Sequence, residues 1–123
     1  MDTSVYVEVL RDNRSIQDRV DQLDTVLVCP VVEGELLYGA ECSARAEADA
    51  ATVLDMMSLG LRIVIDGAVA ASYARIKAQL RRCGTPIPDN DIWVAACAIA
   101  QGATLVSRDR HFAQIDGLAQ EEW

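Results

Sequence analysis

Three short runs of mostly β-branched residues, set apart by longer helical patterns, limit the architecture that this chain can adopt. The runs are VLVC (26–29), RIVI (62–65) and TLVS (104–107). Runs of this length and composition are typical of strands buried on both faces. Apolar residues recur at helical spacing over residues 31–42, 44–59, 68–83 and 92–101. The alternation predicts parallel strands joined by helical crossovers, and so a single three-layer α/β/α domain over residues 1–123 with a short parallel sheet.

Residues 4–12 fit two different patterns. Valine at every second position from Val5 to Val9 is the alternation of a half-buried strand. Thr3 or Ser4 could instead cap a short helix. The pattern by itself leaves both interpretations open.

The charge of the chain limits how it can meet nucleic acid. Eleven basic against nineteen acidic residues give a net charge of −8. A protein that holds nucleic acid by charge needs a basic surface, which this composition does not supply. If the chain acts on such a polymer, a divalent cation has to neutralise its acids locally.

The sequence also indicates where the protein works. No apolar run approaches the roughly 20 residues of a membrane span, and the segment MDTSVYVEVL has no basic start of a secretory signal. The four cysteines form no CxxC motif. We therefore expect reduced, buried or half-buried thiols in a cytoplasmic protein without a membrane partner.

Five acidic residues lie near the predicted ends of strands or the starts of helices: Asp2, Glu35, Asp89, Asp91 and Asp109. In parallel sheets, ligands bind beyond the carboxyl ends of the strands, so these side chains can converge. Converging carboxylates repel unless a cation compensates them, and hard oxygen ligands suit Mg²⁺ or Mn²⁺. Aspartate is also a common N-cap, the role that we expect for Asp66. The spacing alone leaves a metal site, helix capping and a solvated helix face all open.

Five segments of the chain resemble the sequence motifs of PIN-domain ribonucleases. They are DTS (2–4), similar to the opening D-T-N/S; ELLYGA (35–40); IPDNDIWVAA (87–96); LVSRDRHF (105–112), similar to T-x-D-x-x-F; and GLAQEEW (117–123). The motifs come in the family's order and span essentially the whole chain. The closest subgroup is the VapC toxins of type II toxin–antitoxin modules.

The resemblance implies a fold, an activity and a site. The family's catalytic and metal-binding acids correspond to Asp2, Glu35, Asp91 and Asp109, with Asp89 as an auxiliary ligand and Ser107 as a residue that orders the site. The implied activity is endonucleolytic cleavage of RNA with Mg²⁺ or Mn²⁺. The implied partners are an antitoxin that blocks the site and a second copy of the chain in a homodimer. The family also has a helix where residues 4–12 stand.

One departure from the family concerns the first strand. Family members begin with a short apolar strand in the middle of the sheet, whose end carries the first aspartate, whereas only Met1 precedes Asp2 here. We therefore expect a sheet with its first strand missing or truncated, and a natural reading frame that starts upstream.

Other functions fit the sequence less well. A catalytically silent PIN-like binding or regulatory module is the main alternative, although all four family acids are present. A receiver-type signalling domain needs a lysine after a late strand, and the only lysine, Lys77, falls in mid-helix. The glycine motifs of dinucleotide-binding and P-loop enzymes are absent. We expect His111, the only histidine, to lie at the surface outside the site.

Overall fold

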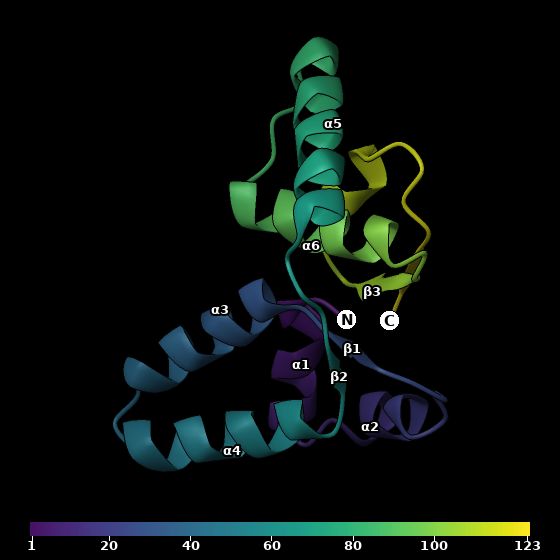
Figure 1. The fold of residues 1–123 in the computed structure, drawn as a ribbon. Coiled ribbons are helices and arrows are strands. Elements are labelled where there is room, and N and C mark those ends of the chain that lie inside the picture. The colour runs from purple at the N-terminus through teal and green to yellow at the C-terminus, as the bar shows by residue number, and fades with distance from the viewer.

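The computed structural model describes all of residues 1–123, and helices alternate with short strands along the chain (Figure 1). The elements in chain order are α1 (Thr3–Leu10), α2 (Arg14–Val20), β1 (Leu27–Val28), α3 (Pro30–Glu41), α4 (Ala46–Ser58), β2 (Leu61–Arg62), α5 (Gly67–Cys83), α6 (Asp89–Ala100), β3 (Leu105–Ser107), the 3₁₀ helix η1 (Arg110–Gln114) and β4 (Gln120–Glu122). This order confirms the predicted α/β class.

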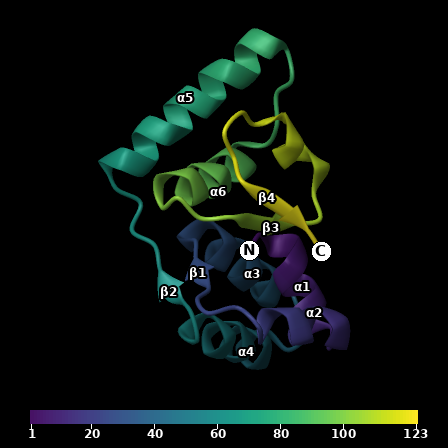
Figure 2. The same cartoon turned by 90° about the vertical axis from the view of Figure 1, so that its right-hand side faces the viewer.

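The helices form two groups with the strands between them. Figure 2 shows α5 and α6 on one side of β3 and β4, and α1 to α4 on the other side. The side chains at the centre of this arrangement are fully buried and come from both groups and from β1: Phe112, Met57, Leu80, Val5, Val28, Val32, Val69 and Cys97. Burial of these apolar side chains stabilises the packing of the two helix groups against the strands.

Local sequence signals define several helix ends. The carboxylate of Asp66 accepts hydrogen bonds from the N–H groups of Ala68 (2.9 Å) and Val69 (3.1 Å), which confirms it as the N-cap of α5. The same helix ends at Gly84, whose φ of +70° is easily adopted only by glycine. Pro30 occupies the first turn of α3, where its missing N–H costs no hydrogen bond.

The first residues form helix α1, as the family resemblance implied, and not a strand. Asp2 caps this helix, because its Oδ1 accepts a hydrogen bond from the N–H of Val5 at 3.2 Å. Val5 is fully buried, while Val7 and Val9 are only partly so. A valine at every second position therefore did not distinguish a strand from a helix with one buried face.

The strands pair as two separate parallel ladders. β1 pairs with β2, with Leu27 opposite Leu61, and β3 pairs with β4, with Leu105 opposite Gln120. The two ladders do not pair with one another, in agreement with the expectation of a truncated sheet. A cavity of about 440 Å³ lies between β1 and β3. Beside it, the N–H of Asp2 donates to the carbonyl of Val106 on β3 at 3.0 Å.

Three details differ from the sequence-based expectations. The run RIVI is a strand only at Arg62, and Val64 and Ile65 are exposed. The end of the chain forms β4, which its acidic composition did not suggest. Of the cysteines, Cys29 and Cys97 are buried as expected, whereas Cys42 and Cys83 are exposed.

Not one of the helices combines the length and the apolar character that a bilayer span requires.

Candidate metal centre

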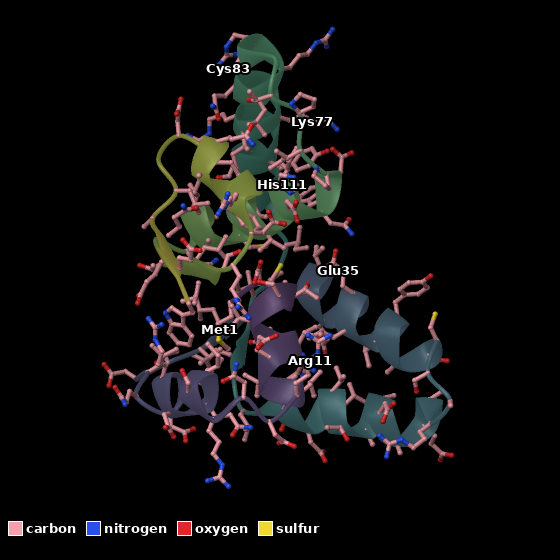
Figure 3. The ribbon with its side chains drawn as sticks, turned by 180° about the vertical axis from the view of Figure 1, so that it is seen from behind. Met1, Arg11, Glu35, Lys77, Cys83 and His111 are labelled. Carbon is pink, nitrogen blue, oxygen red and sulfur yellow. The ribbon has the colours of Figure 1, made fainter.

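Four acidic side chains come from four different elements beside β3. Asp2 is the N-cap of α1, Glu35 lies on α3, Asp91 lies in the first turn of α6, and Asp109 is the N-cap of η1. Figure 3 shows Glu35 in the part of α3 that lies nearer the α5–α6 group, and His111, which belongs to η1, beside that group. The following contacts connect the four acids.

Asp91, Asp109 and His111 form the tightest cluster. One ligand atom from each of the three lies within 4.8 Å of the other two. His111 Nδ1 is 3.2 Å from Asp91 Oδ2 and 3.2 Å from Asp109 Oδ1. The backbone N–H of His111 also donates to Asp109 Oδ1 at 2.9 Å. His111 lies at the surface, as expected, but directly beside Asp91 and Asp109, because the turn of η1 brings its half-exposed ring back toward α6.

The electrostatics of the cluster favour binding of a cation. Burial raises the pKa of Asp91, and so do the nearby carboxylates of Asp109 and Glu35, while the hydrogen bond to His111 opposes the shift. A raised pKa means that the folded protein destabilises the ionised carboxylate. A bound cation would reverse this effect by compensating the negative charge.

Ser107 links two of the acids at the end of β3. Its hydroxyl donates to Asp2 Oδ2 at 2.5 Å and accepts a hydrogen bond from the N–H of Asp109 at 2.9 Å. Ser107 and Asp2 are both only 6% exposed. Ser4 donates to the other oxygen of Asp2 at 2.7 Å. The orientation of the Asp2 carboxylate is thus fixed by two hydroxyl groups.

Glu35 is held by donors from two other elements. Asn90 Nδ2 donates to Glu35 Oε1 at 2.7 Å, and the hydroxyl of Thr3 donates to Glu35 Oε2. Thr3 and Asn90 stand directly beside Asp2 and Asp91 in the sequence. Sequence reasoning missed both as site residues, although this adjacency to two candidate acids is a signal that could have found them.

Asp89 is not brought into the cluster. Its two carboxylate oxygens accept hydrogen bonds from Lys77 Nζ at 2.8 and 3.0 Å. This contact lowers the pKa of Asp89 and raises that of Lys77. The structure therefore turns the predicted auxiliary ligand toward α5.

The donor set can hold a divalent ion. Asp2, Glu35, Asp91 and Asp109 make no ion pair with any lysine or arginine, and their partners are hydroxyl, amide, backbone and imidazole groups. The carboxylate oxygens suit Mg²⁺ or Mn²⁺, whereas an imidazole nitrogen is a more usual ligand of Zn²⁺ and the later transition metals. Ions of this type can activate water and stabilise negative charge at phosphorus.

Known proteins match this chain along nearly its whole length. The PIN domain family model matches residues 1–118. Ribonuclease VapC2 of Haemophilus influenzae is 33% identical over 126 residues, which cover 100% of this chain and 96% of the relative. The tRNA(fMet)-specific endonuclease VapC of Salmonella typhimurium is 30% identical over 127 residues, with coverage of 100% and 96%.

A solved structure shares the fold. A chain in the crystal structure of VapBC2 from Rickettsia felis, bound to a DNA fragment from their promoter, superposes with a TM-score of 0.93 at 26% identity. The superposition covers 99% of this chain and 96% of that chain. The three-layer architecture inferred from the alternation of elements is thus confirmed.

Proposed function

The chain belongs to the PIN domain family, and from this premise we propose that it is a ribonuclease of the VapC type, the toxin of a toxin–antitoxin pair, which cuts RNA endonucleolytically with a divalent metal ion. The observation that carries the proposal is the convergence of Asp91, Asp109 and His111 within 4.8 Å, linked through Ser107 to Asp2. The VapC names of the relatives support the ribonuclease activity.

The residues present fit Mg²⁺ or Mn²⁺. We assign the ion to carboxylate oxygens of Asp91 and Asp109. Asp2 and Glu35 complete the acidic site, and Asp89 lies outside it. When bound, such an ion lowers the pKa of a water molecule and stabilises the charge of a phosphodiester under in-line attack. The net charge of −8 is then compatible with binding of RNA, because the cation supplies the local positive charge that the RNA phosphates require.

The chain's own residues prepare the site. Ser107 holds Asp2 and Asp109 at a fixed separation, because its hydroxyl bonds to both. Thr3 and Asn90 each engage one oxygen of Glu35, which fixes the plane of its carboxylate. Preorganisation of this kind means that the acids do not have to reorient during the reaction.

The VapBC complex among the solved structures suggests the partners. We propose that an antitoxin protein occludes this acidic site until it is released, that RNA is the substrate, and that the active form is a homodimer. RNA as substrate and two buried free thiols agree with action in the cytoplasm.

Cleavage of single-stranded RNA by the purified chain tests the proposal. We expect cleavage with Mn²⁺ or Mg²⁺, loss of cleavage with EDTA, and loss in Asp91→Asn. Asp66→Asn is the matched control, because Asp66, like Asp91, lies at the start of a helix but serves only as its N-cap. If the folded chain cleaves no RNA with either ion, the protein is the catalytically silent module instead.

A further inference from the structure

Two buried thiols face one another between the start of α3 and α6. Cys29 stands between β1 and α3, and Cys97 lies on α6. Their sulfur atoms are 3.5 Å apart, and the residues are 4% and 1% exposed. Neither thiol has a role in the proposed cleavage of RNA. The other two cysteines, Cys42 and Cys83, are exposed, and Figure 3 shows Cys83 near the far end of α5.

The surroundings make the two thiols unequal. The two thiols share a hydrogen bond between their sulfur atoms, which lowers the pKa of Cys29 and raises that of Cys97. The N–H groups of Val31 and Val32 at the start of α3 favour the Cys29 thiolate as well. The nucleophile in thiol oxidation is the thiolate, so Cys29 is the reactive member of the pair.

The cavity between β1 and β3 gives small molecules access to the pair. Cys29 and Cys97 both line this cavity of about 440 Å³. Its lining also includes Leu23 and Glu121, which are exposed, so the cavity opens to solvent. An oxidant of the size of hydrogen peroxide can therefore reach the Cys29 sulfur without unfolding of the chain.

We propose that Cys29 and Cys97 are a dithiol modification site that oxidises to a disulfide between the start of α3 and α6. The Cys29 thiolate attacks one oxygen of hydrogen peroxide and becomes a sulfenic acid, while the other oxygen leaves as hydroxide. The Cys97 sulfur then attacks the Cys29 sulfur, a disulfide forms and the sulfenic oxygen leaves as water. The two sulfurs lose two electrons in total and the peroxide gains them.

The disulfide would act on the geometry of the acidic site. A disulfide bond is about 2.05 Å long, so the sulfurs have to approach by more than 1 Å from their present 3.5 Å. α3 carries Glu35 and α6 carries Asn90 and Asp91, and Asn90 bonds directly to Glu35. We therefore expect the oxidised protein to bind Mn²⁺ several-fold more weakly than the reduced protein.

Peptide mapping of the full chain tests the modification. The protein is treated with hydrogen peroxide, the remaining thiols are alkylated under denaturing conditions, and the digest is read by mass spectrometry with and without dithiothreitol. We expect a cross-linked pair of peptides, one with Cys29 and the other with Cys97. Its mass should be that of the two free-thiol peptides together minus two hydrogen atoms, and dithiothreitol should separate the two peptides. A Cys42→Ser/Cys83→Ser double variant is the matched control and should keep the cross-link.

Two results would overturn the proposal. One is oxidation of Cys42 and Cys83 while Cys29 and Cys97 are both recovered as alkylated thiols. The other is a cross-link from Cys29 or Cys97 to any other cysteine. The mapping is done on the unsubstituted chain, so it does not depend on whether Cys29→Ser folds. It also does not require RNA cleavage, so it stands or falls separately from the proposed function.

Discussion

Replacing Ser107 by alanine should destabilise the metal-free protein and disorder the acidic site together. The hydroxyl is the only group that bonds both to the Asp2 carboxylate and to the N–H of Asp109. An alanine side chain fits the space but can neither donate nor accept a hydrogen bond. The substitution therefore leaves a buried carboxylate oxygen without its donor and a partly buried N–H without its acceptor.

The magnitude follows from these two contacts. A hydrogen bond to a charged group contributes about 1.5–3 kcal/mol, and a buried group left without a partner costs about 1–3 kcal/mol. We expect the free energy of unfolding to fall by about 3 kcal/mol, which is a large share of the roughly 5–15 kcal/mol of a typical domain. With an ordinary urea dependence, the unfolding midpoint should fall by about 1.5 M.

Urea unfolding in EDTA, followed by fluorescence of the two tryptophans, measures this effect. Ser4→Ala is the matched control, because Ser4 also donates to Asp2 but lies nearer the surface, and about 1 kcal/mol is expected there. Ser107→Thr keeps the hydroxyl and should restore most of the stability. If Ser107→Ala unfolds at the same urea concentration as the unsubstituted chain, or if Ser4→Ala costs more, the assignment of Ser107 to the site is refuted.

Three further predictions concern stability. Burial first, and then Asp109 and Glu35, raise the pKa of Asp91, so the metal-free protein should lose stability as the pH rises through the folded-state pKa of Asp91. Asp91→Asn should remove that loss and raise the melting temperature in EDTA near neutral pH, and a lower melting temperature would contradict this. Asp66→Ala should cost about 1 kcal/mol in urea unfolding and Asp66→Asn less, since asparagine also caps helices, with RNA cleavage retained in both. A chain with about four added residues before Met1, alternately apolar, should melt at a higher temperature. The added residues can fill the cavity beside Leu27 and pair with the free edge of β3. An unchanged melting temperature would show that the cavity does not accept a strand.

The sequence predicted the order of the elements better than the sheet. Helices can be predicted from local periodicity and capping residues, as Asp66 and Gly84 show for α5. Strand pairing depends on neighbours that are distant in the chain. The run RIVI has the composition of a strand, but only Arg62 of it pairs, opposite Val28. The separation of the strands into two ladders is likewise a matter of tertiary contacts.

The candidate site was predictable in its acids and in Ser107, and not in its other supporting residues. The motifs select Asp2, Glu35, Asp91 and Asp109 by position. Some of the bonds that orient them join distant residues, such as Thr3 to Glu35, 32 positions apart, and Ser107 to Asp2, 105 positions apart. The approach of His111 to Asp91 depends on the path of η1, and the turn of Asp89 toward Lys77 depends on the packing of α5 on α6. Contacts of this kind are set by tertiary structure and leave no periodic signal in the sequence.

The four acids of the site differ from the ion-paired acids of the surface. Five acidic residues elsewhere in the chain pair with arginine or lysine, among them Glu33 with Arg62 and Asp89 with Lys77. The four acids of the site have hydroxyl, amide, backbone and imidazole partners instead, and none of them pairs with lysine or arginine. Such an arrangement is costly for the fold, since Asp91 has a raised pKa. A binding site for a divalent cation gives these charges a function, and it explains why Ser107 contacts both Asp2 and Asp109 while His111 contacts both Asp91 and Asp109.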